Sequence, residues 1–250
     1  MSGYGAETYG ERWASVYDEW VARQTHISDA EVIADRLAEL AGAGPALELA
    51  IGTGRIALPL AERGVEVHGI DASEAMVEKL RAKPGGGDIP ITIGDFADVG
   101  VEASYSLVYI VFNTFFALPT QQDQVRCFRN VAAHLTEDGV FALEAFVPDP
   151  TYYEHGQSLR TTEVGPDLVG LTAATHDPVE QRVRAMILQF DAAGIRLLPV
   201  QLRYAWPPEI DLMARLAGLR LRDRWGGWDR SLFTSDSGRH VSIYEHAPGN

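Results

Sequence analysis

The sequence predicts a doubly wound α/β fold, in which helices cover both faces of a mostly parallel sheet, with an antiparallel β insert after the fifth strand. Two observations indicate this class. Apolar strand-like segments alternate with amphipathic helical patterns through residue 147, and the segment 46–54, ALELAIGTG, runs from a strand through two glycines into a helix. From residue 148 the alternation stops and four strand-like segments follow one another.

Composition places the chain among globular proteins and excludes several partners. The 250 residues are 46% hydrophobic and 22% charged, which is ordinary for a globular domain. A net charge of −14 argues against nucleic acid as a partner, because phosphates are neutralised by clustered Lys and Arg. The single cysteine, Cys127, and the lack of an 18-residue apolar run or a signal sequence predict a cytoplasmic protein that does not contact the membrane.

The N-terminal segment carries aromatic residues at helical spacing. Tyr9, Trp13, Tyr17 and Trp20 are spaced by four, four and three residues, which places their rings on one helical face within 6–23. Such a stripe indicates either core packing or a helix that folds over a ligand as a lid. The next helix begins at a capping box formed by Ser28 and Glu31.

The glycine turn after the first strand predicts a ligand crevice. Gly52 and Gly54 remove side chains where the chain enters the helix 55–63, so that a ligand can lie against backbone amides at the helix start. Glu48 adds a carboxylate to the same crevice. Pro59 lies within the predicted helix and is expected to kink it slightly. Taken alone, this turn fits NAD and S-adenosylmethionine (SAM) equally well.

The later strands of the nucleotide-binding part follow in order. Strands are predicted at 65–70, 89–93, 106–111 and 140–147, and a helix at 122–135. Asp71 ends the second strand, where an acceptor-only carboxylate can bind a ribose diol. The run 106–111 is almost entirely apolar, as expected of a central strand that is buried on both faces.

Several motifs in order resemble the class I SAM-dependent methyltransferases over residues 40–147. They are Glu48-x-Ala50-x-Gly52-x-Gly54, the segment 69–76 (GIDASEAM), the triplet 94–96 (GDF), and a long helix followed by 136–139 (TEDG) before a strand. The resemblance implies a Rossmann-like sheet of seven strands. Ala50 departs from the family pattern, which usually has glycine there.

The resemblance also implies a cofactor site for SAM, with S-adenosylhomocysteine as the product. It assigns Asp95 to the adenine amino group and the Phe96 amide to the adenine ring edge, and it places the segment that begins at Phe112 beside the sulfonium. The cofactor-binding residues expected are Glu48, Ala50, Gly52, Thr53, Gly54, Asp71, Ala72, Met76, Asp95, Phe96, Phe112 and Asn113.

The chain after residue 147 divides into an insert and an ending. Strands are predicted at 159–164, 168–175, 182–190 and 195–204, then a helix at 209–217 and two last strands at 219–225 and 241–245. We therefore expect three parts: 1–147 with the lid and the SAM-binding core, 148–208 as an antiparallel cap over the substrate, and 209–250 completing the core sheet. An insert after the fifth strand further resembles the natural-product branch that includes the amino-sugar N-methyltransferases.

Candidates for acceptor binding are mostly aromatic. The substrate-binding residues expected are Tyr17, Trp20, Phe116, Phe146, Tyr152, Tyr204, Trp206 and Trp228. No residue pattern identifies a general base, and Tyr17, Tyr153 and His155 are weak catalytic candidates. A metal site is not expected, because His, Asp and Glu show no ligand spacing.

The leading interpretation is a SAM-dependent methyltransferase that acts on N or O of a small organic acceptor in secondary metabolism. Two alternatives stay open: an NAD-dependent oxidoreductase, and a SAM-binding protein that transfers no methyl group. The alternation of Met186, Leu188 and Phe190 on one side of their strand also predicts an apolar face on the insert. Such a face is compatible with a homodimer.

Overall fold

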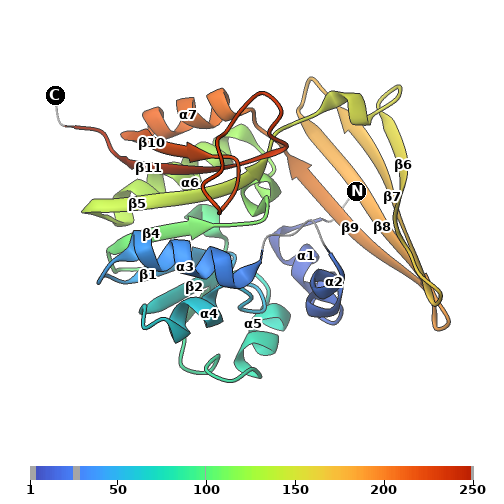
Figure 1. Ribbon diagram of the computed structural model, residues 1–250, viewed down its shortest axis with the longest axis horizontal. Helices are drawn as coiled ribbons and strands as arrows, with labels where there is room; N and C mark the ends of the chain where they lie inside the picture. Colours follow the sequence, from blue (N-terminus) through green and yellow to red (C-terminus); the bar gives the residue numbers. More distant parts are fainter. Residues whose placement is uncertain (1–3, 25–28, 99, 249–250) are drawn as a thin grey trace.

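A computed structural model describes residues 4–24, 29–98 and 100–248 and contains two separate sheets (Figure 1). The strands of the seven-stranded sheet are β1 (Ala46–Leu49), β2 (Val67–Asp71), β3 (Ile91–Ile93), β4 (Tyr105–Ile110), β5 (Leu135–Phe146), β10 (Leu219–Trp225) and β11 (Arg239–His246). The insert sheet has the antiparallel strands β6 (Gln157–Val164), β7 (Leu168–Asp177), β8 (Arg182–Asp191) and β9 (Gly194–Arg203). The predicted fold class is confirmed.

Strand order creates the position at which a ligand can bind. The large sheet has the order β10-β11-β5-β4-β1-β2-β3, with β1 to β5 parallel and β11 antiparallel to both neighbours. The direction of winding changes between β1 and β4. In doubly wound sheets the ligand crevice lies outside the carboxyl ends of the strands at this switch point.

Helices cover both faces of the large sheet. Helices α3 (Ala30–Ala41), α4 (Ala57–Glu62) and α5 (Glu74–Arg81) share one buried cluster with the sheet. Helices α6 (Gln121–His134) and α7 (Pro207–Leu216) pack on the opposite face in a second cluster. Short 3₁₀ turns, η1 (Phe96–Asp98), η2 (Thr114–Ala117) and η3 (Pro150–Tyr152), follow β3, β4 and β5. Both faces of the central strands are therefore buried.

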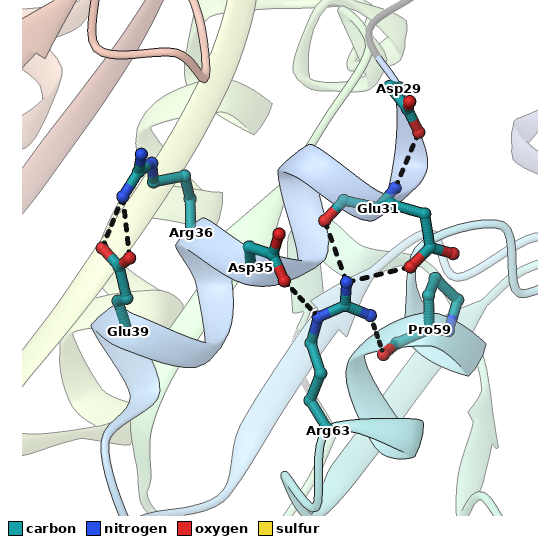
Figure 2. Close-up of polar contacts among 7 residues, drawn as sticks. All are labelled: Asp29, Glu31, Asp35, Arg36, Glu39, Pro59 and Arg63. Atoms are coloured by element: carbon teal, nitrogen blue, oxygen red, sulfur yellow. Dashed lines mark hydrogen bonds and ion pairs between the residues drawn. The ribbon is translucent and has the colours of Figure 1, made fainter.

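An ion-pair network joins α3 to α4, as Figure 2 shows. The Arg63 guanidinium contacts Asp35 at 2.7 Å and Glu31 at 2.9 Å, and it donates to the Pro59 carbonyl at 2.7 Å. The kink expected at Pro59 is wrong, because α4 begins at Ala57 and so Pro59 lies in the first turn, where no helical N–H is needed. For the helix start before α3, Asp29 is the N-cap and bonds the Glu31 amide, whereas Ser28 lies outside the described residues.

The N-terminal aromatic segment forms two helices, α1 (Ala6–Trp13) and α2 (Tyr17–Arg23), in place of the single helix expected. A turn at residues 14–16 separates them and brings the Trp13 and Trp20 rings edge to face, with centroids 4.9 Å apart. Figure 1 shows helices α1 and α2 between the two sheets. Trp13 is fully buried between Met76 and Leu198, and its Nε1 donates to the Pro199 carbonyl at 3.3 Å. The α1–α2 pair thus contacts the core and the insert together.

The insert sheet has an inner and an outer face. The inner face carries Val183, Ala185 and Ile187 of β8, which pack on the core and on the α1–α2 pair. The outer face carries Leu188, which pairs with Leu171 and Leu197 on the neighbouring strands. Its apolar side chains include Leu159, Ile195 and Leu197, which are 71, 63 and 54% exposed. The predicted apolar face is therefore present and largely uncovered within the described chain.

Candidate active site at the carboxyl ends of the strands

The turn that follows β1, residues 50–54, is built on left-handed backbone. The φ angles of Ala50, Gly52 and Gly54 are 58°, 57° and 78°. A Cβ on Gly54 would lie 2.8 Å from the Leu80 side chain, so this glycine lets α5 approach closely. At Gly52 a Cβ would meet nothing nearer than the Ala50 carbonyl at 4.0 Å. The backbone at Gly52 therefore presents an open surface at the switch point.

Ala50 occupies the left-handed region without being glycine, and its replacement should stabilise the protein. Left-handed backbone costs an L-residue about 1 to 2 kcal/mol, while glycine adds about 0.5 to 1 kcal/mol of unfolded-chain entropy. We expect Ala50→Gly to raise the free energy of unfolding by about 0.5 to 1 kcal/mol, or Tm by about 1 to 4 °C. Thermal unfolding measures this, and Ala61→Gly within α4 is the control that should lower Tm. A lower Tm for Ala50→Gly would contradict the strain argument.

The glycine turn borders a small recess of about 30 Å³, well below the volume of a ligand pocket. It lies between the turn, the end of β4 and helix α2. The lining residues are Tyr17, Glu48, Ala50, Ile51, Gly52, Thr53, Arg55, Ile56, Val111, Phe112 and Thr114. Six of the predicted site residues meet here: Glu48, Ala50, Gly52, Thr53, Phe112 and Tyr17.

Glu48 is a buried carboxyl group in the wall of the recess. It is 3% exposed, and Tyr109 donates its hydroxyl to Oε2 at 2.9 Å. The two residues are partners in the β1–β4 register, which is why their side chains meet. Burial raises the pKa of Glu48 to about 8, while the Tyr109 hydrogen bond and the positive charge of Arg55 limit the rise. Its charge therefore changes near neutral pH.

Asp71 holds the backbone around the recess. Its Oδ2 accepts from the Gly52 amide at 2.7 Å and its Oδ1 from the Ser73 amide at 2.8 Å. Burial raises the pKa of Asp71, and these two amides oppose the rise. Each carboxylate oxygen keeps a second acceptor position, so the anchoring role is compatible with binding a diol.

The other expected cofactor residues follow β2 and β3 and are not among the residues that line the recess. The Gly94 amide donates to the Asp71 carbonyl at 2.9 Å, which places the end of β3 beside the end of β2. Asp95 follows there and accepts from the Ala97 amide at 2.9 Å. Phe96 packs against the core cluster, and Met76 lies under Trp13. Ala72 comes between Asp71 and the N-cap of α5.

Two consecutive residues after β4 adopt left-handed backbone. The φ angles of Phe112 and Asn113 are 54° and 64°, and each such residue costs about 1 to 3 kcal/mol. The Glu144 carboxylate accepts from the Phe112 amide at 3.0 Å, and the Asn113 side-chain oxygen accepts from the Phe146 amide at 2.6 Å. The end of β5 therefore fixes the turn that carries Phe112 into the recess.

Helix α2 closes over the recess from the side of the insert. Trp20 contacts Phe112, with ring centroids 6.1 Å apart, and Arg55 lies 5.8 Å from the centre of the same ring. Burial raises the pKa of Tyr17, and its hydrogen bond to Arg55 opposes the rise. The aromatic ring of Phe112 thus lies where α2, the glycine turn and β4 meet.

A polar contact attaches α2 to the glycine turn. Thr53 donates its hydroxyl to Asp18 at 2.6 Å, Lys83 pairs with Asp18 at 2.7 Å, and the Lys83 ammonium donates to the Thr53 carbonyl at 2.8 Å. We name these three side chains the α2 latch. They join the helix, the turn and the loop after α5.

The remaining acceptor and catalytic candidates separate into three groups. Phe116 and Trp228 are not brought to the recess, because both are fully packed in the core on opposite faces of the large sheet. Tyr152, Trp206 and His155 are exposed. The other three candidates, Phe146, Tyr153 and Tyr204, lie at the junction of core and insert. Phe146 packs edge to face on Phe116. Tyr153 stacks on the ring of His176, whose Nε2 lies 2.8 Å from the Tyr204 hydroxyl.

Several residues of the site were not predicted. Arg55, Tyr109 and Lys83 each contact a predicted residue: Phe112, Glu48 and Thr53, respectively. The position of Arg55 directly after Gly54 was a usable signal, because the residue that follows the glycine turn borders the crevice. Among the described residues, no group of three His, Cys, Asp or Glu side chains is arranged to hold a metal ion. No helix in the described ranges is long and apolar enough to cross a membrane.

Comparisons with known proteins point to one chemistry. Residues 46–139 match the family model described as a methyltransferase domain. The CcbJ methyltransferase from Streptomyces caelestis superposes with a TM-score of 0.93 at 41% identity, over 98% of this chain and all of that one. A cypemycin N-terminal methyltransferase of Streptomyces sp is 28% identical over 80% of this chain and 82% of its own. SAM-bound CalS10, an amino pentose methyltransferase from Micromonospora echinaspora, shares the fold, with a TM-score of 0.71 at 23% identity over 92% of this chain and 96% of that one.

Proposed function

This chain belongs to the SAM-dependent methyltransferases, and on that premise we propose that it methylates an amino nitrogen of a small natural-product molecule. SAM is thereby the cofactor, and the NAD alternative is set aside. Nitrogen is favoured over oxygen because relatives are named for peptide N-terminal and amino-sugar N-methylation. The single observation that carries the proposal is the recess at the switch point, where the open glycine turn, a buried carboxyl group and an aromatic ring converge.

The residues around the recess fit the cofactor. The space over Gly52 admits a ligand against the backbone. We assign Asp71 to the ribose diol, and Asp95 with the Phe96 amide to adenine. When bound, SAM supplies a methyl group on a sulfonium that is already activated for displacement. Phe112 presents its ring to that positive charge, a contact worth about 1 kcal/mol.

The protein's own contribution is chiefly alignment. Holding an amine in line with the methyl group supplies several kcal/mol, up to roughly 10 in favourable cases. An amine in its neutral form attacks without a base. We assign the entrance for the acceptor to Tyr17 and Trp20 of α2. Tyr17 lines the recess and has a hydroxyl group, and Trp20 contacts the Phe112 ring.

Calorimetry with SAM, S-adenosylhomocysteine and NAD tests the cofactor assignment directly. Methyl transfer is then followed by mass spectrometry with a panel of amino sugars and short peptides that have free amino termini. Binding of SAM and the gain of one methyl group on an amine are expected. Methylation of hydroxyl acceptors alone would contradict the nitrogen assignment. SAM binding without transfer to any acceptor of a broader panel would favour a SAM-binding protein with another role.

We also propose a division of labour along the chain. Residues 1–147 bind SAM and carry the α1–α2 pair as a lid, 148–208 cap the acceptor, and 209–250 complete the core sheet. The contacts of Trp13 with Met76 of the core and Leu198 of the insert support a lid that packs against both of these parts. The lone Cys127, fully buried and in no disulfide, supports a cytoplasmic location.

The α2 latch gives a first measurable consequence of the lid. Asp18→Asn removes the charge that pairs with Lys83, and we expect the affinity for SAM to fall by up to about fivefold, because an ion pair with half-exposed partners contributes about 1 kcal/mol or less. Calorimetry at low and high salt measures this. The control is Glu19→Gln, which removes the neighbouring charge on the same helix, where Glu19 pairs only with Arg23 among the described residues. Equal affinities for the two variants would remove the latch from cofactor binding.

The outer face of the insert supports a proposal about assembly. We propose that two copies pair through this face about a two-fold axis, because Leu159, Ile195 and Leu197 would otherwise stay in water. Light scattering at micromolar concentration should give a mass near twice 27.4 kDa. Leu188→Glu should return it to one chain, whereas Leu212→Glu on exposed α7 should not. A single-chain mass for the unmodified protein would leave the insert as a cap only.

A further inference from the structure

The turn after β4 is held in an unfavourable conformation by its surroundings. Phe112 and Asn113 are both left-handed, although neither is glycine. Such pairs persist only where neighbouring groups fix them, and they concentrate at functional sites. The contacts that fix this turn therefore identify residues on which the site depends.

All three contacts come from the end of β5. The Phe112 amide donates to Glu144 Oε2 at 3.0 Å, and the Asn113 amide donates to the Glu144 carbonyl at 3.3 Å. The Phe146 amide donates in return to the Asn113 side chain. Of these three hydrogen bonds, only the one from the Phe112 amide to the Glu144 carboxylate involves an ionisable side chain. Charge-assisted hydrogen bonds are stronger than neutral ones.

Core packing does not explain a carboxylate at position 144. The residue is 5% exposed in a strand whose neighbours are apolar, and a buried charge is costly unless it is paired. Its side chain also lies 3.9 Å from the guanidinium of Arg239, which is 38% exposed. An apolar residue would fill the same space at lower cost, and the hydrogen bond from the Phe112 amide is a specific gain that offsets this cost.

The held turn carries the ring that faces the recess. Phe112 lines it between Trp20 and Arg55. A shift of the turn would move this ring relative to the glycine turn, and a displacement of about 1 Å is enough to cost on the order of 100-fold in rate.

We propose that Glu144 is a positioning residue for methyl transfer, which fixes the Phe112 ring against the reacting methyl group by binding the Phe112 amide. The inference rests on the proposed function and adds to it a residue that does not itself touch the substrate. It separates alignment from binding: Glu144 should matter for the rate of transfer much more than for the affinity of SAM.

The first test needs no turnover. In protein labelled with ¹⁵N-phenylalanine, hydrogen exchange at the Phe112 amide should be at least about tenfold faster in Glu144→Leu than in wild type, and near wild type in Glu144→Gln, which keeps an acceptor oxygen. Arg239→Gln is the control, because it removes the ion-pair partner and leaves the acceptor in place. Equal exchange in wild type and Glu144→Leu would overturn the contact.

The second test measures transfer with the best acceptor of the amine panel. Single-turnover rates should fall about 30- to 100-fold in Glu144→Leu, with the SAM dissociation constant changed less than threefold, and Glu144→Gln should recover most of the rate. In a Phe112→Ala background, Glu144→Leu should have little further effect. Independent, multiplying effects of the two changes would overturn the proposal, as would an equal loss of SAM affinity. Failure of the wild type to bind SAM would instead refute the proposed function, leaving the exchange result to judge Glu144.

Discussion

Replacing Glu48 with glutamine should make the free protein more stable near pH 8 and weaken its affinity for SAM. Burial raises the pKa of Glu48 from an ordinary 4.5 to about 8. The folded state therefore holds the proton more tightly than the unfolded chain. This contribution to stability is complete below about pH 4.5 and is lost as the pH rises to about 8. At about 1.4 kcal/mol per pKa unit, the loss is on the order of 4 kcal/mol.

Glutamine keeps the shape of Glu48 but does not titrate. The difference in unfolding free energy between variant and wild type should thus grow steadily between about pH 5 and pH 8, and urea unfolding at several pH values measures it. Other titrating groups cancel in this difference. Glu62→Gln, an exposed change on α4, is the control for a surface carboxyl. A flat difference for Glu48→Gln would show that the Glu48 carboxyl titrates normally.

Affinity should change in the opposite direction. The ionised Glu48 borders the recess where we propose that the cationic cofactor binds, and the loss of a charged hydrogen-bonding group costs about 1.5 to 3 kcal/mol. We expect SAM to bind the variant about 10- to 150-fold more weakly near pH 8. Calorimetry of wild type in buffers of different ionisation enthalpy should also detect proton release on binding near neutral pH.

Replacing Asp71 with alanine should damage both the turn and the cofactor site. The change leaves the buried amides of Gly52 and Ser73 without their acceptor, at about 1 to 3 kcal/mol each. We expect the free energy of unfolding to fall by on the order of 2 to 5 kcal/mol and SAM affinity to fall about 10- to 150-fold.

Asp71→Asn provides the matched comparison, because it keeps one acceptor oxygen and should retain more stability than alanine. Urea unfolding and SAM calorimetry on the folded fraction measure the two effects separately. A folded Asp71→Ala protein with unchanged SAM affinity would remove Asp71 from the cofactor site.

The succession of strands along the chain and the position of the glycine turn were predictable because they depend on local patterns. The residues around Gly52 and Gly54 were enough to predict a turn. The position of Asp71 at the end of the second strand was enough to predict that it lies at the crevice. The contact between Glu48 and Tyr109 was not predictable, because it depends on the register of β1 against β4. Registers of parallel strands are set by packing between distant segments.

Aromatic residues were the least predictable part of the site. Phe116, Trp228 and Trp20 were all predicted as substrate-binding aromatic residues. Of the three, only Trp20 contacts the ring of Phe112, whereas Phe116 and Trp228 lie in the core. The spacing of Tyr9, Trp13, Tyr17 and Trp20 fitted one helix, but the turn at residues 14–16 lets Trp13 and Trp20 meet. Composition cannot separate a wall of the site from core, because both bury rings.

The burial of Trp13 between Met76 and Leu198 has a consequence for how the chain is made. Domains generally fold from the N-terminus as synthesis proceeds. Helix α1 emerges from the ribosome first, yet one wall of its binding site arrives only with β9, when residues 194–203 have been made. Complete burial of Trp13 must therefore wait until about four-fifths of the protein has been made.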